Sequence, residues 1–563
     1  MTETKTSERV AMAAPEAEAE PAEPTGFVLE QGKRFSQSVL WQLTRDYYHQ
    51  RGLSAWESGT VPSYVTSNPY IAQVYANLII TFLKNCLLRQ GAQNADDAAA
   101  AGRCRIDPKQ PLYIVELAAG HARFSYLFLK KFLALKNAST LRHLDIRYVM
   151  TDFTETNLKE WAKQPLFRPF LDQGVLHFAL FDLESDQTIR IAGDHPPLSA
   201  ETVKNPLIVL GNYIFDSLTQ DYFRVESGKL LQGLITTRAP SSDPPDLSDP
   251  EVMSQFDISF DYHAVEKDSF YDDPELDQVL VGYRQRLNDS TIVFPLGPIR
   301  ALSRLAHIAG QRLLVLSSDK GYTHEDELYY LSGQAIQFHG SFSTMVNYHA
   351  MGQFIRGRGG VYLATSQRQL NLKTVALLLG GDADYFADTL LDFRERVDTF
   401  GPYDYYTLIN HLRVAVQQNL SLDGCMELLR LSHFDPQIFL EFNRILLENA
   451  ASLNDTARAE MQVALERIWD NFFPLGKDLP FEIARMYLAI RRPREALRYN
   501  EISLQMFGEH PVTFCNMGIC HYHAEDFQEA RRYFARSLAL NPDYGLPKAW
   551  LARVNAEQER LTS

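Results

Sequence analysis

Four polar residues of this sequence stand where successive predicted strands end: Glu116, Asp152, Asp182 and Asn212. In a doubly wound parallel sheet the carboxyl ends of the strands form one rim, so these four side chains are expected to line one crevice. An acidic residue after the second strand can accept hydrogen bonds from both ribose hydroxyls, and Asp182 after the third would meet an adenine amino group. Together the four residues predict a nucleoside-type ligand.

The stretch Leu112–Ser125 leads from the first of these strands into a helix. Its apolar strand ends at Glu116, a turn of small residues follows, and a helical pattern begins near Ala122. Gly120 lets the backbone of this turn approach a ligand without an intervening Cβ. A strand, a tight turn and a helix in this order form the entry unit of a nucleotide-handling α/β domain.

The apolar pattern predicts the elements that carry this rim. Strands separated by helical connections are typical of a parallel, doubly wound sheet with right-handed crossovers. The predicted strands are Leu112–Leu117, Ile146–Thr151, Val175–Phe181, Pro206–Gly211 and Arg312–Ser317, with Gly360–Ala364 as an edge strand. We expect a short helix from Glu155 to Ala162. The segment from Phe27 to about Asp107 is expected to be mainly helical, with one helix starting at Thr66–Pro69.

The segment between the fourth and fifth strands is too long for a simple crossover. It contains a hairpin-like pair, Tyr222–Val225 with Leu230–Thr237, and a loop rich in Pro, Ser and Asp over Ala239–Pro250. An insertion at the carboxyl edge of the sheet lies where ligands bind in such folds. It is expected to shape the substrate site, although a decoration of the fold would give the same pattern.

After about Gly380 the strand signals end and amphipathic helices follow. The spacing from Ile483 to Met517, and from Met517 to Leu551, equals the tetratricopeptide period, and the large and small residues between them fit that repeat. Such repeats offer a concave surface for a protein segment, or they cap a neighbouring domain. The sequence leaves both roles open.

Composition limits the classes of function. The 563 residues are enough for two or three domains. A net charge of −15 argues against a broad nucleic-acid footprint, because phosphate binding needs clustered Lys and Arg. The five cysteines form no metal-spaced pair, so reduced thiols in a cytoplasmic protein are expected, with no metal site.

The sequence also lacks several targeting and catalytic signatures. Residues 1–26 are rich in Ala, Glu and Pro without an apolar core, which predicts a disordered tail. No stretch approaches the ~20 apolar residues that span a bilayer. The phosphate-binding loop, the zinc-protease helix and the serine-hydrolase elbow are all absent from the sequence.

Four segments resemble one known family in the family's own order. The turn Glu116–Phe124, ELAAGHARF, is similar to the E-L-G-P-G-R-G turn of MidA-type methyltransferases, which include mitochondrial complex I assembly-factor methyltransferases. Asn212–Phe223 resembles that family's N-E-x-L-D-A-x-P-V segment. Val61–Ala76 resembles its early G-D-F-x-T-S region, and Ser343–Met351 its late V-D-F-T-A segment.

The resemblance implies a class I, Rossmann-like fold that binds S-adenosyl-L-methionine and, in characterised relatives, methylation of an arginine ω-nitrogen on a protein. The matching segments cover roughly Phe35–Ala364, and the repeats lie outside them. Together with the sequence pattern they predict a methyltransferase domain over 27–379 with the insertion at 220–310, a helical region at 380–475 and tetratricopeptide repeats at 476–563. The residues expected to bind the cofactor are Thr66, Ser67, Glu116, Ala118, Gly120, Arg123, Asp152, Phe153, Asp182, Leu183 and Asn212.

The acceptor site departs from the family pattern. Asn212 and Asp216 are candidates for orienting the acceptor, and Tyr213 is a candidate aromatic or hydroxyl contact, although relatives carry Glu at the Tyr213 position. Ala118 and Ala122 replace two family glycines, so their Cβ atoms must fit beside the cofactor or exclude it. The sequence therefore predicts a protein methyltransferase with a docking surface on its repeats. A catalytically inactive scaffold and a small-molecule methyltransferase remain as alternatives.

Overall fold

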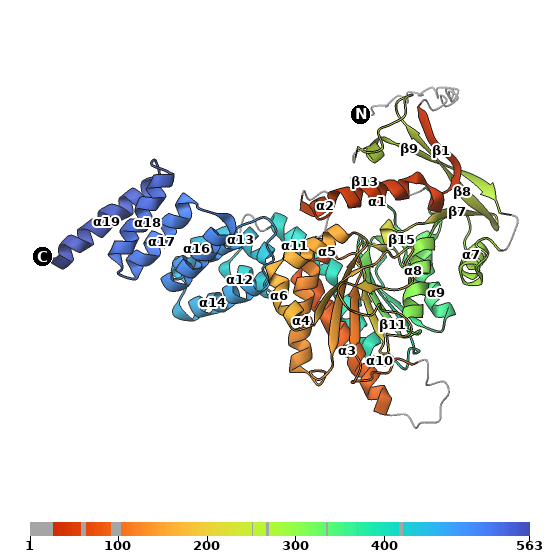
Figure 1. The fold of residues 1–563 in the computed structure, drawn as a ribbon, viewed down its shortest axis with the longest axis horizontal. Coiled ribbons are helices and arrows are strands. Elements are labelled where there is room, and N and C mark those ends of the chain that lie inside the picture. The colour runs from red at the N-terminus through yellow and green to blue at the C-terminus, as the bar shows by residue number, and fades with distance from the viewer. Residues whose placement is uncertain are drawn as a thin grey trace, which may run out of the picture.

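The protein consists of an α/β body that carries a helical arm, with the C-terminus at the far end of the arm (Figure 1). The computed structural model describes residues 26–57, 64–91, 103–249, 252–265, 269–333, 336–339, 341–368, 370–415 and 420–562. The predicted tail, 1–26, therefore lies outside the described residues except for Gly26.

The body is built on an eight-stranded sheet in the order β16-β17-β11-β6-β2-β3-β4-β5. Its five central strands run parallel, as predicted. They are β2 (Leu112–Glu116), β3 (Ile146–Asp152), β4 (Leu176–Leu180), β6 (Leu207–Leu210) and β11 (Leu313–Asp319). The chain winds outward from β2 in both directions, which places a topological switch point between β2 and β6.

Three short or antiparallel strands complete the edges of this sheet. The predicted edge strand is β16 (Val361–Ala364). The sequence pattern did not predict β17 (Lys373–Leu379), which lies between β16 and β11 and runs antiparallel to both. All seven of its residues are buried, and a short, continuous apolar run does not distinguish a strand from a helix. At the other edge β5 (Arg190–Ile191) pairs with β4.

Helices cover both faces of the sheet. Residues of one strand alternate between the faces, so Ile114 packs into one hydrophobic core and Val115 into the other. One face is covered by α3 (Pro69–Gly91), α4 (Arg123–Ala138) and α10 (Ala387–Phe393), and the other by α7 (Pro274–Arg286), α8 (Leu296–Ile308) and α9 (Tyr348–Gly357). The short helices α5 (Glu155–Lys163) and α6 (Arg168–Asp172) lie along the chain between β3 and β4. The predicted helix at 155–162 is thus confirmed.

Helix α3 begins as predicted, because Asn68 caps it. The Asn68 Oδ1 accepts hydrogen bonds from the backbone N–H groups of Tyr70 and Ile71 at 3.0 and 3.1 Å. The expectation that no stretch approaches the length of a membrane span needs correction, because Tyr64–Leu88 is, among the described residues, one segment long and apolar enough by length and composition. Of its most apolar window, 67% is buried inside the protein, which is the pattern of a core helix.

A second, antiparallel sheet lies above the rim of the first (Figure 1). It contains the predicted hairpin, β7 (Asp221–Glu226) with β8 (Lys229–Ala239), together with β9 (Asp257–Ala264) and β10 (Ser290–Phe294). Its remaining strand is β1 (Phe27–Arg34), where the sequence pattern predicted helix. That prediction was wrong because β1 lies at an edge of the sheet and mostly outside the core, so it shows no long apolar run.

The helix α1 (Val39–Arg51) packs on this second sheet and is followed by the short α2 (Ser54–Glu57). The Trp41 and Phe342 rings lie 4.6 Å apart, and the Trp41 Nε1 donates to the Phe35 carbonyl at 2.7 Å. Short strands join this layer to the body: β12 (Gly321–Tyr322), β13 (Gln337–His339), β14 (Ser341–Ser343) and β15 (Val346–Asn347). Together with α1, the second sheet forms a module above the rim.

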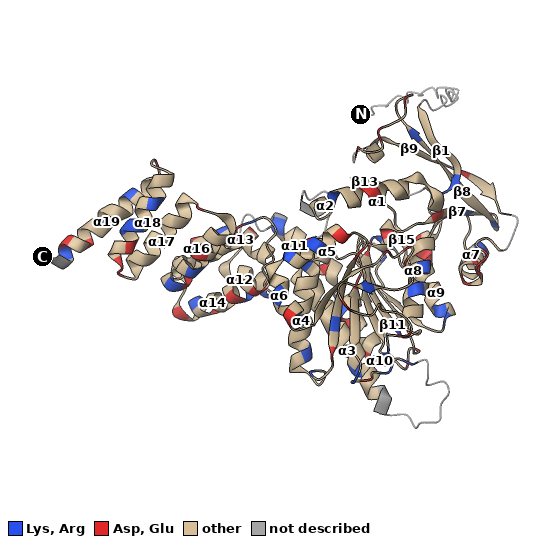
Figure 2. Ribbon diagram, in the orientation of Figure 1, with Lys and Arg blue, Asp and Glu red and all other residues tan. Residues whose placement is uncertain are grey.

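The helical arm begins after α10. It comprises α11 (Pro402–Ala415), α12 (Leu422–Leu431), α13 (Pro436–Asn449), α14 (Asp455–Asp470), α15 (Leu479–Ala489), α16 (Pro493–Phe507), α17 (Pro511–His523), α18 (Phe527–Leu540) and α19 (Gly545–Thr562). Close packing of α17 on α18 requires a small residue, since a Cβ on Gly518 would lie 2.6 Å from Phe534 Cε1. Acidic and basic residues are interspersed over these helices (Figure 2).

The arm is joined to the body by specific contacts beside the start of α4. Arg123, the first residue of α4, pairs with the buried Asp435 at 3.4 Å, and Tyr64 donates to the same carboxylate at 2.9 Å. The Tyr70 and Tyr405 rings stack with centroids 4.4 Å apart. Lys130 extends the interface by pairing with Asp470 at 3.4 Å.

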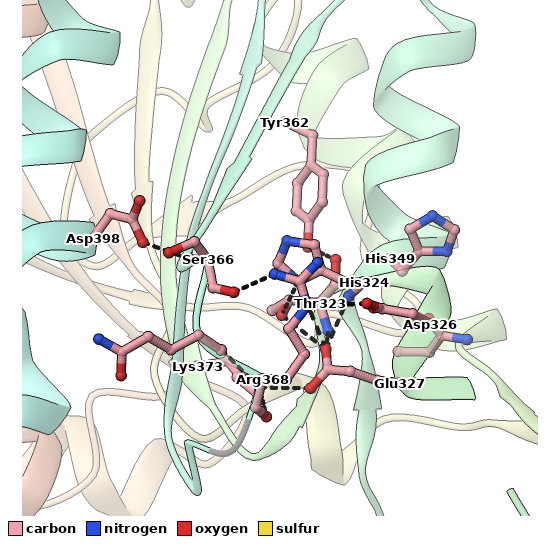
Figure 3. A network of polar contacts seen from close by, with 12 residues as sticks. Thr323, His324, Asp326, Glu327, His349, Tyr362, Ser366, Arg368, Lys373 and Asp398 are labelled. Atoms are coloured by element: carbon pink, nitrogen blue, oxygen red, sulfur yellow. Dashed lines mark hydrogen bonds and ion pairs between the residues drawn. The ribbon is translucent and has the colours of Figure 1, made fainter. Parts of the chain in front are cut away.

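A polar network fixes the β16–β17 edge of the large sheet (Figure 3). Glu327 accepts from the backbone N–H groups of Thr323 and His324 at 2.7 and 2.9 Å, and from the buried Lys373 Nζ at 2.6 Å. Burial alone would raise the pKa of Glu327, but these hydrogen bonds outweigh it and lower the pKa to about 2. Because Lys373 begins β17, the network anchors that strand.

Candidate functional site

A cavity opens at the carboxyl ends of β2, β3, β4 and β6, at the switch point of the large sheet. Eleven predicted site residues line it: Thr66, Ser67, Glu116, Ala118, Gly120, Asp152, Phe153, Asp182, Leu183, Asn212 and Tyr213. Arg123 and Asp216 do not. The side chains at the ends of four strands therefore meet around one cavity.

Glu116, which precedes the turn, lines the cavity. Its Oε2 accepts from the Tyr148 and Ser125 hydroxyls, each at 2.5 Å. Burial raises the pKa of Glu116 to about 7, although both hydrogen bonds act in the opposite direction. A positively charged ligand group beside it would favour the carboxylate form.

The turn after β2 adopts the backbone conformation that normally calls for glycine. Ala118, Gly120 and Ala122 have φ values of 47°, 53° and 66°, all in the left-handed region. The Ala119 N–H donates to the Thr151 carbonyl at 3.0 Å, and Trp161 Nε1 donates to the Gly120 carbonyl at 2.8 Å. These contacts hold the turn in shape despite the two alanines.

The two alanines of the turn differ in what their methyl groups face. Ala122 is 1% exposed, belongs to the hydrophobic core and does not line the cavity. Ala118 is half-buried and does line it. Of the two expected obstacles to a ligand, the structure therefore places only the Ala118 methyl group at the cavity.

Asp152, at the end of β3, is held by the first residues that follow it. Its Oδ1 accepts from the Thr154 backbone N–H and hydroxyl, both at 2.9 Å, and its Oδ2 from Asn157 Nδ2 at 2.9 Å. Burial raises its pKa despite these donors. Asn157 also lines the cavity, and its buried Oδ1 has no hydrogen-bond partner among the described residues.

Asn157 was missed from the sequence, where it reads only as part of an amphipathic helix. Its free acceptor lies beside the carboxylate that was expected to hold a ribose. Two neighbouring acceptors, one charged and one neutral, match the two hydroxyl donors of a ribose.

Asp182 at the end of β4 is engaged by a residue of α1. The Arg45 Nη2 lies 2.7 Å from Asp182 Oδ2, and the Arg45 guanidinium carbon lies 4.9 Å from the centroid of the Phe153 ring. Burial raises the pKa of Asp182, but the hydrogen bond from Arg45 outweighs it, so the pKa is below its ordinary value. Arg45 was not predicted because its helix is remote in sequence from the rim.

Asn212 and Tyr213, after β6, are rigidly held. Asn212 lines the cavity, and its Oδ1 accepts from the Tyr75 hydroxyl at 2.8 Å and from the Ser318 N–H at 3.0 Å, so the donor that its side chain can offer a ligand is the amide N–H₂. Tyr213 has φ 49°, and burial raises its pKa. A non-glycine residue in this conformation is strained, a feature that clusters at functional sites.

Asp216 lies behind the cavity wall and next to a second carboxyl group. Ser217, which lines the cavity, donates to Asp216 Oδ1 at 2.9 Å. The Asp216 N–H in turn donates to Asp319 Oδ2 at 3.3 Å. Burial raises the pKa of Asp216 to about 6 and that of Asp319 well above its usual value. Asp319 ends β11, so the rule that nominated the other rim residues would have found it.

Arg123, predicted as a cofactor contact, is directed toward the helical arm. It pairs with Asp435, and its guanidinium carbon lies 5.6 Å from the centroid of the Tyr64 ring. Among the described residues no group of three His, Cys, Asp or Glu side chains could hold a metal ion. The side chains that line the cavity are both polar and apolar.

Comparisons with known proteins place one module of the chain. A tetratricopeptide-repeat family model matches residues 511–544, which cover α17 and α18. The crystal structure of an uncharacterised protein from Burkholderia thailandensis is similar to this chain, with 13% sequence identity and a TM-score of 0.36. The match covers 63% of this chain and 90% of that protein. A related protein from the same organism, bound to S-adenosyl-homocysteine, has 12% identity and a TM-score of 0.35 with the same coverage. No curated protein matches the chain. The chain is an α/β protein followed by a helical region that contains a tetratricopeptide repeat.

Proposed function

We propose that this protein is an S-adenosyl-L-methionine-dependent methyltransferase that acts on a protein. The observation that carries the proposal is the convergence of Glu116, Asp152, Asp182 and Asn212 around one cavity at the switch point of the sheet. The ends of four strands place hydrogen-bonding side chains around this cavity. The order of these side chains along the rim matches the order of the parts of a nucleoside joined to an amino acid.

The residues present fit such a ligand along its length. Asp152 and the unpartnered Asn157 Oδ1 would hold the ribose hydroxyls, and Phe153, Asp182 and Leu183 would form an adenine subsite. Glu116 and the turn around Gly120 would face the methionine end. When bound, S-adenosyl-L-methionine supplies a sulfonium methyl group that is already activated for transfer.

The chain then has to position a nucleophile and exclude water. Asn212 would donate from its amide to the acceptor, and the strained Tyr213 would present its ring or hydroxyl beside it. Asp216, reached through Ser217, would take up a proton that the acceptor releases, since its pKa of about 6 lies near neutrality.

An arginine ω-nitrogen is the acceptor that the family resemblance implies. Asp216 and Asp319 are buried behind the cavity wall, and their negative charge supports a cationic acceptor because it would attract a guanidinium held against the wall at Ser217. The tetratricopeptide match supports docking of a protein segment on the arm. The cytoplasm is the compartment that we propose, from the cysteine usage.

An inactive scaffold is the second candidate, favoured by the Ala118 methyl group at the cavity and by Arg45 on Asp182. Incubation of the purified protein with a cell lysate and methyl-labelled cofactor separates the candidates. We expect label on a protein, dependent on the added enzyme and lost in Asp152→Ala. Label on a small metabolite would instead identify a small-molecule methyltransferase, and no label would favour the scaffold.

A further inference from the structure

The Arg45 side chain contacts both Asp182 and Phe153, the two residues of the proposed adenine subsite that could hold the base. The Arg45 Nη2 and Nη1 groups lie 2.7 and 3.4 Å from the two carboxylate oxygens of Asp182. The same guanidinium lies over the Phe153 ring, 4.9 Å from its centroid. Arg45 therefore makes a bidentate ion pair with Asp182 and a cation–π contact with Phe153 at the same time.

An adenine would make the same two interactions at the same place. Its amino group would donate to Asp182, and its planar ring would stack on Phe153. A guanidinium is likewise planar and donates N–H bonds from its edge. Because Arg45, Phe153, Asp182 and Leu183 all line one cavity, the guanidinium and the base would compete for the same acceptors and the same ring face.

The Arg45 side chain can leave without disturbing its helix. The body of α1 is anchored to the second sheet, through Trp41 packed on Phe342 and through Tyr48, whose hydroxyl lies 3.1 Å from Ser341 Oγ. The Arg45 side chain itself is 32% exposed and the Asp182 side chain 22%. An arginine with this access to water can turn outward at small cost, since partly exposed ion pairs contribute little.

We propose that the Arg45 guanidinium and the base of the nucleoside compete for Asp182 and Phe153, so that the nucleoside binds by displacing Arg45 from both residues. The inference rests on the proposed function, because it takes S-adenosyl-L-methionine or its demethylated product as the ligand. Arg45 is then an autoinhibitory residue that sets the affinity for cofactor without contributing to its binding.

The test is calorimetric titration of S-adenosyl-homocysteine into the wild type, Arg45→Ala, Arg45→Gln and Arg51→Ala. We expect both Arg45 variants to bind about five- to thirtyfold more tightly, the combined worth of one partly exposed ion pair and one cation–π contact. Arg51→Ala is the matched control: Arg51 is an exposed arginine of the same helix that does not line the cavity, so its affinity should equal that of the wild type.

Salt provides a second readout. Raising NaCl from about 20 to about 500 mM screens the Arg45–Asp182 pair, so the wild type should bind more tightly while Arg45→Ala changes little. Equal or weaker binding by folded Arg45→Ala and Arg45→Gln would overturn the inference while leaving the proposed function intact. Failure of the wild type, Arg51→Ala and both Arg45 variants to bind would overturn the proposed function and the inference with it.

Discussion

The backbone N–H of Asp216 donates to Oδ2 of Asp319 at 3.3 Å, so two buried carboxyl groups lie beside one another at the end of β11. Burial and mutual repulsion raise the pKa of Asp319, and burial raises the pKa of Asp216 to about 6. A carboxyl group with a raised pKa binds its proton more tightly in the folded than in the unfolded state. Its contribution to stability is therefore greatest below about pH 4 and is lost as the pH rises through its folded pKa.

This relationship predicts the pH dependence of stability in Asp319→Asn. The amide cannot ionise and does not repel the Asp216 carboxylate. The free energy of unfolding of the variant, relative to that of the wild type, should therefore be higher at about pH 8 than at about pH 4. Urea denaturation at both pH values measures this difference. Asp243→Asn, at an exposed site, is the control: the difference between its free energy of unfolding and that of the wild type should be the same at both pH values. A pH-independent effect of Asp319→Asn would contradict the prediction.

Asp152→Ala should weaken the binding of S-adenosyl-homocysteine at least about tenfold, since a charge-assisted hydrogen bond contributes about 1.5–3 kcal/mol. Titration calorimetry measures the loss, with circular dichroism to establish that the variant is folded. Asp172→Ala, at an exposed carboxylate in an ion pair with Arg168, serves as the control and should bind normally. Unchanged affinity in folded Asp152→Ala would exclude Asp152 from the ribose site.

Ala118→Gly should raise the free energy of unfolding by about 0.5–1 kcal/mol, because glycine adopts a φ of 47° without the strain that a Cβ imposes. The neighbouring Ala119 is 8% exposed and its φ is not positive, so Ala119→Gly should instead be destabilising by about 1 kcal/mol. Thermal and chemical denaturation of the two variants provide the comparison. Destabilisation by Ala118→Gly would show that its methyl group packs favourably against the cavity wall.

Arg123→Ala should be destabilising by about 2–4 kcal/mol, because it removes the ion-pair partner of the buried Asp435 carboxylate. Addition of Asp435→Asn should recover part of this loss. Lys130→Ala removes an exposed ion pair from the same interface and should cost less than about 1 kcal/mol. In Arg123→Ala, the affinity for S-adenosyl-homocysteine should stay within about threefold of the wild-type value. A larger loss would restore the cofactor role that the sequence assigned to Arg123.

Local sequence patterns were sufficient to predict the parallel strands and most of the polar residues along the rim. Buried parallel strands appear as continuous apolar runs, and each ends at a polar residue that the sheet then places on a common edge. Glu116, Asp152, Asp182 and Asn212 could therefore be grouped without a structure. The repeat was also visible from the sequence, because its packing requires small residues such as Gly518 at fixed intervals.

Tertiary structure alone decided what each rim residue contacts. Arg45 reaches Asp182 from a helix 137 positions earlier in the chain, and Arg123 turns away to Asp435, 312 positions later. The strands β1 and β17 likewise take their form from partners that are remote in the sequence. Periodicity reports which face of an element is buried, whereas pairing between distant elements depends on how the whole chain packs. The sequence by itself thus determined the parallel strands, most of the rim and the repeat, and only the packing of α1 and the arm against them decided which rim groups remain available to a ligand.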